Sequence, residues 1–303
     1  MLKALMGEIN PSGKLAESYP VKYEDVSSSP YFPSKQRSAE YREGLYVGYR
    51  YFETANVPVL FPFGFGLSYT TFEYSELKVT EKEATFTLKN TGKMDGAEVT
   101  QLYVSKLSSE VFRPAKELKG FQKVFLKAGE SKTVTIPLDD KAFRYFNVQT
   151  NQFEVEGGEY QILIGSYVAD IKLSGSVTVA GTGAPNPYDS KLLSDYYTGN
   201  IKTIPDVEFE NLLGHPIPDG SWSGTLTMND ALCQMYYAKS WLARRVYGIL
   251  TRLLNKSMEK GKPNLNLMFN YNMPFRGIAK MTGGMCTMEM AEGILIVVNG
   301  HFF

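Results

Sequence analysis

Residues 84–93 read ATFTLKNTGK, and the apolar side chains of Ala84, Phe86 and Leu88 alternate in them with polar ones. A period of two places successive side chains on opposite faces of a β-strand, so one face is buried and the other meets solvent. The run NTGK at 90–93 is a turn signal that ends the strand. This stretch therefore predicts one strand of an antiparallel sheet.

Similar short apolar or alternating stretches, separated by turn signals, continue along the chain up to about residue 181. Further strands are predicted at 99–104, 133–138, 153–155, 160–164 and 171–179. Seven or so short strands with no helical period favour an antiparallel β-sandwich over residues 70–181. Because no Cys-Trp-Cys pattern is present, a fibronectin-III-like sandwich is favoured over an antibody-like one. The fold class is therefore mainly β.

The segment before the sandwich, residues 1–69, is rich in Pro, Gly, Ser and Tyr, and only residues 38–52 have a helix-like pattern. A segment this irregular buries too little apolar surface to offset its own ordering entropy, so we expect it to pack against another part of the protein. Its apolar run at 61–66 is interrupted by Pro and Gly, which indicates a buried loop.

The segment after the sandwich changes character twice. Residues 182–228 are expected to be a linker, because the segment opens with GTGAPNP at 181–187. Residues 229–303 are expected to form a helical extension. Its first helix is predicted over 229–260, capped by Asn229 or Thr227, from the helical spacing of Met235, Leu242, Val246, Ile249 and Leu253.

Two further signals complete this extension. Gly261 and Pro263 are expected to end the first helix, and a second helix is predicted over 287–298. The methionines of this region are expected to fill a core rather than a cofactor site; they are Met281, Met285, Met288 and Met290.

Composition excludes several classes of function. The 303 residues include 32 Lys and Arg against 32 Asp and Glu, so nothing in the net charge favours nucleic acid. Cys233 and Cys286 form no metal or disulfide pattern and are expected to be buried free thiols in a reducing compartment. His215 and His301 are too few for a histidine-rich metal site. We expect no metal and no cofactor.

Targeting signals are absent from the sequence as it stands. The apolar stretch at the N-terminus is too short for a signal peptide, and no run approaches 18 apolar residues. A cytoplasmic location is the default expectation. The sequence ends on Phe302 and Phe303 directly after a predicted helix, which suggests, together with the irregular first segment, a piece of a longer protein.

Three ordered stretches resemble glycoside hydrolase family 3. NPSGKL at 10–15, followed by Tyr19 and Pro20, resembles the motif near the end of that family's α/β sandwich domain, with Ser18 where the family usually has Thr. YREGLYVGYRYF at 41–52 is similar to a second family segment. LFPFGFGLSYTTF at 60–72 resembles one of the family's most specific signatures.

The predicted sandwich extends this resemblance. NTG at 90–92, RPAKELKGF at 113–121 and AGES at 128–131 resemble the fibronectin type III-like domain of the family. The stretch from Asn272 to Met285 is similar to a helical extension of some bacterial members. The resemblance implies that residues 1–69 are the end of an α/β sandwich domain plus a connecting segment.

The resemblance implies a glycosidase activity for the family, together with the expectation that this chain lacks the residues that perform it. Family members of this type are retaining β-glycosidases, which need a nucleophilic carboxylate and an acid/base carboxylate about 5 Å apart. The family's nucleophilic Asp lies in an N-terminal barrel in a Ser-Asp-Trp-like context, and Ser194-Asp195-Tyr196 is a chance similarity. Glu8 stands too close to the NPSGKL motif to be the acid/base residue. The chain alone is expected to lack both catalytic residues.

Candidate positions at the rim of the substrate cleft follow from the second motif. They are Glu43, Tyr49 and Arg50. The alternative is structural: Glu43 pairs with Arg42 or Arg50 to hold an irregular segment in place, and the tyrosine is a packing residue. The parent enzyme would act on a β-linked glucoside or oligosaccharide.

Two other functions compete with this hypothesis. One is a non-catalytic scaffold module whose sandwich binds a glycan or a protein. The other is peripheral membrane contact through the basic helix at 229–260, for which the favoured alternative is a solvated face with an apolar stripe docked on a neighbouring domain.

Overall fold

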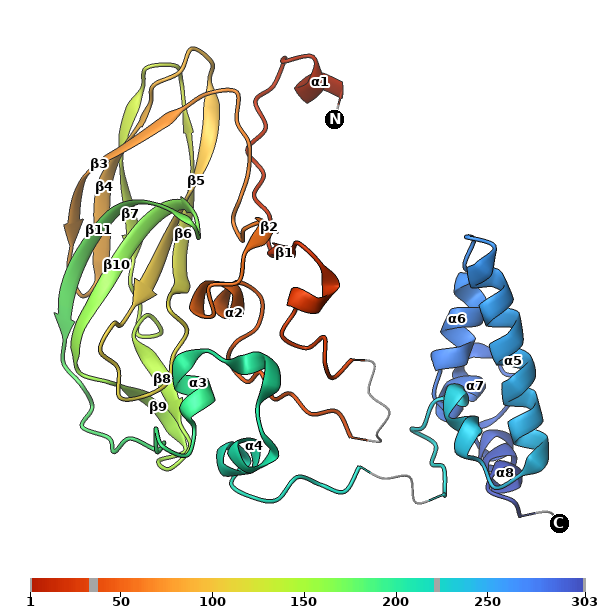
Figure 1. Cartoon of the computed structure of the whole chain (residues 1–303). Coiled ribbons are helices and arrows are strands. Elements are labelled where there is room, and N and C mark those ends of the chain that lie inside the picture. Colours follow the sequence, from red (N-terminus) through yellow and green to blue (C-terminus); the bar gives the residue numbers. More distant parts are fainter. Residues whose placement is uncertain (1, 33–37, 221–223, 302–303) are drawn as a thin grey trace. The chain divides into compact units, whose positions relative to one another are not determined.

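The computed structural model describes residues 2–32, 38–220 and 224–301, and it has two compact units (Figure 1). The first unit comprises residues 1–33 and 40–218, and the second comprises 34–39 and 219–303. Among the described residues, the first unit contains two buried hydrophobic cores and the second contains one. Phe302 and Phe303, on which the expectation of a longer protein partly rests, lie outside the described residues.

Two antiparallel sheets of the first unit form a β-sandwich, as the sequence predicts (Figure 1). One has the strand order β11-β10-β5-β6, with bounds Asp170–Val179, Gly158–Tyr167, Gly96–Ser105 and Glu117–Leu126. The other has the order β3-β4-β7, with bounds Phe72–Val79, Glu83–Asn90 and Ser131–Pro137. A separate hairpin joins β8 (Arg144–Asn147) to β9 (Gln152–Val155).

The alternation in β4 has the predicted outcome. Ala84, Phe86 and Leu88 are fully buried in the core between the sheets, where Ile162 and Ile164 of β10 meet them. Each buried side chain of this size contributes about 1.5–3 kcal/mol relative to an exposed one. The apolar face of β4 therefore fixes which side of the sheet faces inward.

Strand β5 departs from a simple alternation, because every residue from Thr100 to Ser105 is buried. Leu102 and Val104 belong to the sandwich core. Gln101 and Tyr103 point to the other face, which residues from the irregular N-terminal segment cover. The second face of the sheet is therefore closed by sequence that lies outside the sandwich.

The N-terminal segment has only short elements. They are α1 (Leu2–Leu5), β1 (Tyr19–Pro20), η1 (Tyr23–Asp25), α2 (Tyr49–Thr54) and β2 (Val59–Phe61), with β1 and β2 paired antiparallel. The helix predicted over 38–52 is wrong in its first part. Gly44 and Gly48 have φ values of +53° and +58°, a left-handed conformation that interrupts a right-handed helix.

The range expected to be a linker is largely folded. It contains α3 (Ser194–Thr198), η2 (Ile201–Thr203) and α4 (Asp206–Leu213). Tyr196 and Ile201 are fully buried in a core that they share with Tyr46 and Phe112. Only the beginning of this range lacks helices and strands, as expected of a linker. The later residues supply about half of a second core.

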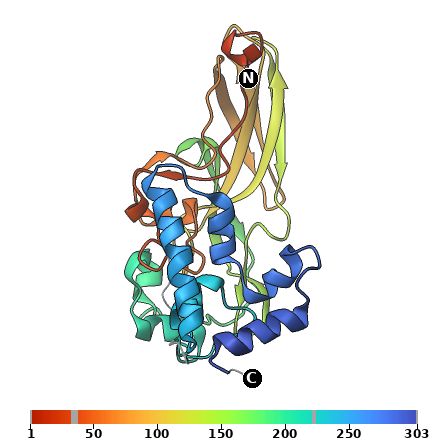
Figure 2. The same ribbon diagram turned by 90° about the vertical axis from the view of Figure 1, so that its right-hand side faces the viewer.

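The second unit is helical (Figure 2). Its elements are η3 (Leu232–Tyr237), α5 (Trp241–Glu259), α6 (Leu265–Asn272), α7 (Phe275–Met281) and α8 (Met288–Val298). The predicted second helix is confirmed, with Thr287 as its N-cap. The end of α8 meets the start of α5, because Ser240 N donates to Val298 O over 3.2 Å.

The first helix of this unit begins later than predicted. Ser240, rather than Asn229 or Thr227, is its N-cap and accepts a hydrogen bond from Ala243 N. Thr227 instead donates to Asp230 Oδ2 in a turn before η3. Gly261 follows the helix with φ of +65°, in agreement with the predicted stop.

Two expectations about sulfur-containing residues need correction. The methionines expected in the core are largely exposed, with 82% of Met285 and 61% of Met281 accessible. The core cluster of their unit is small, with six buried hydrophobic side chains among the described residues, and none of these four methionines belongs to it. Cys233 and Cys286 are free, as expected, but only half-buried.

Membrane spanning was tested on the helices of the described residues. None of them combines the length and the hydrophobicity that crossing a bilayer requires. The cytoplasmic location remains a prediction.

Candidate functional site

The loop from Phe61 to Tyr69 joins the N-terminal segment to the sandwich. Leu15 N donates to Phe65 O and Gly64 N donates to Leu15 O, each over 2.8 Å. On the sandwich side, Val168 N donates to Phe63 O over 3.1 Å. This loop therefore holds two parts of the chain that are more than 40 residues apart.

Gly64 and Asn10, which belong to the motif stretches, have specific contacts. Gln101 Nε2 donates to Gly64 O over 3.2 Å, and a Cβ on Gly64 would lie 2.2 Å from Gln101 Oε1. Asn10 Oδ1 accepts from Tyr69 N over 2.9 Å, and its side-chain nitrogen donates to Ser68 Oγ. Ser18 Oγ accepts from Phe63 N, so serine performs this contact where the resembling family has threonine.

Tyr49, the first residue of α2, packs against the sandwich. Its ring stacks on Phe63 with centroids 4.6 Å apart and meets Tyr103 edge-on. Its hydroxyl accepts a hydrogen bond from Leu118 N over 2.8 Å, and burial raises the pKa of this hydroxyl. These contacts match the packing alternative for this residue.

Arg50 reaches the same sandwich strand. Its Nη2 lies 3.5 Å from Glu117 Oε1 in a half-exposed ion pair, and its Nε is buried without a hydrogen-bond partner in the structure. The alternative in which Arg50 pairs with Glu43 is therefore wrong. Together, Tyr49 and Arg50 fix α2 to the start of β6 at Glu117 and Leu118.

Glu43 is not joined to these two residues. It lies in a half-exposed turn before α2, near Tyr196. Among the described residues, no hydrogen bond or ion pair to its carboxylate is recorded, and Arg42 pairs elsewhere. The structure thus separates the three candidate residues into a packed pair and one free carboxylate.

Two carboxylates do converge in this unit, on the guanidinium of Arg42. Glu40 Oε2 lies 2.6 Å and Asp206 Oδ1 lies 2.7 Å from Arg42 Nη2. Arg42 is itself buried, and its Nη1 donates to Ile204 O. A cation held between the two acids satisfies both of them, so this cluster joins the N-terminal segment to α4 and does not present a nucleophile and an acid to a substrate.

Asp195 and Glu208 form a second acidic neighbourhood. Glu208 Oε1 accepts from Asp195 N over 2.7 Å, at the start of α3, and Asp195 Oδ1 accepts from Asn200 Nδ2. Burial raises the pKa of Glu208, and the nearby charge of Asp195 adds to the shift. Because Glu208 bonds backbone amides, it acts as a helix cap.

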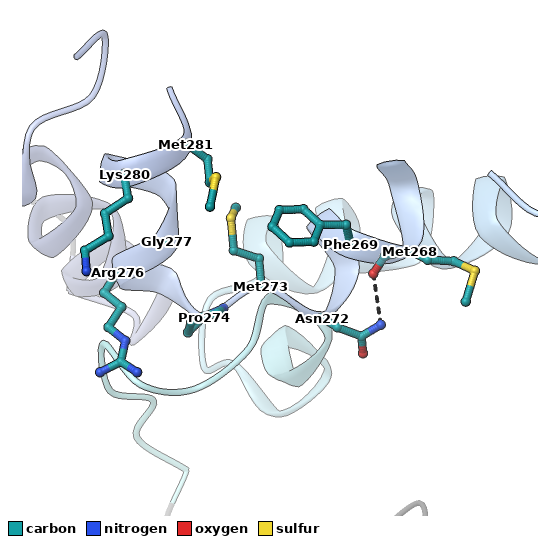
Figure 3. A pocket seen from close by; sticks show the side chains of 9 residues that line it. All are labelled: Met268, Phe269, Asn272, Met273, Pro274, Arg276, Gly277, Lys280 and Met281. Carbon is teal, nitrogen blue, oxygen red and sulfur yellow. Dashed lines mark hydrogen bonds between the residues drawn. The ribbon is translucent and has the colours of Figure 1, made fainter. Parts of the chain in front are cut away.

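A concave surface lies in the second unit, between α6 and α7 (Figure 3). Its volume is about 470 Å³. Phe269, Met273 and Met281 turn their side chains toward one another, while Arg276 and Lys280 lie to one side (Figure 3). No group of three or more metal-binding side chains occurs among the described residues.

Comparison with known proteins shows what this chain is similar to. Residues 98–168, from β5 to the end of β10, match the fibronectin type III-like domain family. The chain is 52% identical over 186 residues to the thermostable β-glucosidase B of Acetivibrio thermocellus. The matched stretch makes up 59% of this chain and 25% of that protein. A crystal structure of a family 3 β-glucosidase from Bifidobacterium adolescentis superimposes with a TM-score of 0.58 at 38% identity, over 66% of this chain and 31% of that one.

The chain is homologous to the C-terminal portion of glycoside hydrolase family 3 enzymes. The relatives also include an exo-α-(1→6)-L-arabinopyranosidase of Bifidobacterium breve, 44% identical over 188 residues that make up 60% of this chain and 25% of that protein. The chain spans about a quarter of the length of the curated relatives that it matches. The curated relatives come from both bacteria and fungi.

Sequence reasoning missed two parts of the first unit. The core around Tyr46 and Tyr196 joins residues 150 positions apart, and the Arg42 cluster joins Glu40 to Asp206. The only available signal was the set of aromatic residues at 188–209 in a range otherwise typical of a linker. Neither periodicity nor a local motif marked it.

Proposed function

We propose that this chain is the non-catalytic C-terminal part of a family 3 β-glucosidase, an enzyme that hydrolyses a β-linked glucoside or oligosaccharide. The observation that carries the proposal is the attachment of the motif segment to the sandwich. Gly64, Tyr49 and Arg50 contact Gln101, Leu118 and Glu117 through groups that belong to the resembling motifs. A free-standing binding module has no need of such a segment.

The chain's own acids support catalytic incompleteness. A retaining glycosidase needs two carboxyl groups about 5 Å apart with room for the sugar between them. Glu40 and Asp206 instead share the guanidinium of Arg42, and Glu98 is paired with Lys14. We expect the purified 303-residue chain to release no chromophore from an aryl β-glucoside.

The assay needs a positive control and a variant. The β-glucosidase of Acetivibrio thermocellus serves as the control, and Glu40→Gln/Asp206→Asn serves as the variant. Hydrolysis that rises in proportion to the concentration of the pure chain would show that the chain is a complete enzyme. Equal hydrolysis by the unaltered chain and the variant would show that Glu40 and Asp206 take no part in it.

We also propose Glu43 as the residue of this chain that approaches the substrate rim, with Tyr49 and Arg50 positioning the segment that carries it. Its support is a half-exposed carboxylate without a recorded partner among the described residues. Saturation-transfer NMR with methyl β-glucoside tests this: Glu43→Gln is expected to reduce the transfer, while Glu73→Gln, an exposed position on β3, leaves it unchanged. Equal transfer in both variants would remove Glu43 from the rim.

The domain boundaries accompany this proposal. We propose the end of an α/β sandwich domain with its connecting segment at 1–69, the fibronectin-like sandwich at 70–181, a connection at 182–228 and a helical extension at 229–303. The likeness of this extension to bacterial members belongs to the same proposal.

A further inference from the structure

The longest helix of the second unit, α5, carries an apolar stripe beside the face that packs into the core. Leu242, Val246, Ile249 and Leu253 are 42–54% exposed. The residues that pack into the core lie on an adjacent face of the same helix; they are Ala243, Tyr247 and Leu250. Within the described part of its own unit, the stripe is about half exposed.

The stripe forms one wall of an apolar groove. Leu242 and Val246 of α5 face Ile294 and Val297 of α8 across a cavity of about 430 Å³. The two acidic residues of α8, Glu289 and Glu292, do not line it. A groove of this kind binds apolar groups rather than a polar substrate.

Basic side chains border the stripe on the side opposite the core. At about 100° per residue, Arg245, Arg252 and Lys256 lie about 50–90° from the middle of the stripe. All three are exposed, and no salt bridge to them is recorded among the described residues. Residues 219–303 contain nine Lys and Arg against five Asp and Glu, a net charge of +4 in a chain whose total is zero.

The same combination occurs at a second place in the unit. The groove between α6 and α7 has an apolar wall of Phe269 and Met281, and Arg276 and Lys280 lie beside it (Figure 3). Trp241, at the first turn of α5, is 63% exposed. Tryptophan and basic residues next to an apolar stripe are typical of helices that lie in a membrane interface.

We propose that α5 and its groove with α8 bind the surface of an anionic phospholipid bilayer. The apolar stripe would enter the boundary between headgroups and acyl chains, and the three bordering cations would contact anionic headgroups. Charge decides against a second copy of this chain, because an interface between two identical α5 faces would bring Arg245, Arg252 and Lys256 against their own counterparts. The helix lies on the bilayer and does not cross it.

Vesicle co-sedimentation of the whole 303-residue chain tests the proposal. We expect pelleting with vesicles of phosphatidylcholine and phosphatidylglycerol, little with phosphatidylcholine alone, and a decrease as salt rises. Arg245→Gln/Arg252→Gln/Lys256→Gln is expected to weaken binding about 100-fold, since each cation near such a surface contributes about a factor of five. Leu242→Gln/Ile249→Gln, which keeps the charge, is expected to abolish stable association.

A matched control removes three exposed lysines from the first unit. Lys82→Gln/Lys123→Gln/Lys141→Gln has the same change in net charge and is expected to bind as the unaltered chain does. Far-ultraviolet circular dichroism shows whether each variant keeps its helices. Equal pelleting by neutral and anionic vesicles, no pelleting, or a control that loses as much as the α5 variant would each overturn the proposal, as would a dimer in light scattering that α5 substitutions dissociate.

Discussion

Lys14 Nζ lies 2.7 Å from Glu98 Oε1, and the two side chains are 14% and 8% exposed. Lys14 belongs to the NPSGKL stretch and Glu98 to β5, so this ion pair spans 84 positions of sequence. Burial raises the pKa of Glu98, and the charge and hydrogen bond of Lys14 oppose that shift. The pair therefore depends on both partners being present.

Removing one partner should destabilise the first unit. Lys14→Met leaves the Glu98 carboxylate buried without its cation, and we expect a loss of about 2 kcal/mol or more in the free energy of unfolding. Near-ultraviolet circular dichroism of the tyrosines reports mainly on this unit, because 16 of the 20 tyrosines precede residue 219. Lys172→Met, which breaks the exposed pair with Asp170, should cost less than about 1 kcal/mol. Equal losses would show that burial of the pair has no effect.

The loss of unfolding free energy caused by Lys14→Met should depend on pH. A carboxyl group whose pKa is higher in the folded than in the unfolded chain stabilises the fold below the unfolded pKa, and this contribution is lost as pH rises through the folded pKa. Without Lys14 the pKa of Glu98 rises further. The difference in unfolding free energy between Lys14→Met and the unaltered chain should therefore shrink from about pH 7 to about pH 5. A difference that grows on acidification would contradict this assignment.

Gly64→Ala should separate backbone strain from steric conflict. Its φ is +81° and its new Cβ would lie 2.2 Å from Gln101 Oε1. Gly129→Ala provides a matched control, since its φ is +78° and nothing lies within 4 Å. Both substitutions should lower the free energy of unfolding by about 1–2 kcal/mol through left-handed backbone strain, and we expect only Gly64→Ala to lose more than this. Chemical denaturation measures both, and equal losses would show that Gln101 moves away freely.

Tyr196→Phe should loosen the folded part of the expected linker. The hydroxyl of this buried residue donates to Arg42 O over 2.8 Å. Its loss leaves a buried carbonyl without a donor, which costs about 1–3 kcal/mol. Amide exchange in α3 should become faster. The neighbouring Tyr197→Phe removes an exposed hydroxyl that donates to Glu110 O and should have a smaller effect. The prediction is wrong if the two variants exchange alike.

The strands of the sandwich were predictable because their information is local. Ala84, Phe86 and Leu88 mark an inward face by their spacing alone. Helix α8 was predictable for the same reason, through its period and its closing Asn299 and Gly300. The α5 start was not, because the apolar period continues through Met235 while the chain there forms a separate 3-10 turn.

The sequence by itself determined the sandwich, the resemblance to the family and the lack of a local catalytic signature. The motif strings and the period-two strands need no partner to be recognised. Only the tertiary structure decided that residues 188–213 share a core with Tyr46, that Arg42 holds Glu40 and Asp206 together, and that the α5 stripe stays half exposed within its own unit. These are contacts between residues far apart in sequence, and a local pattern of apolar and polar residues cannot say which distant surface a side chain meets.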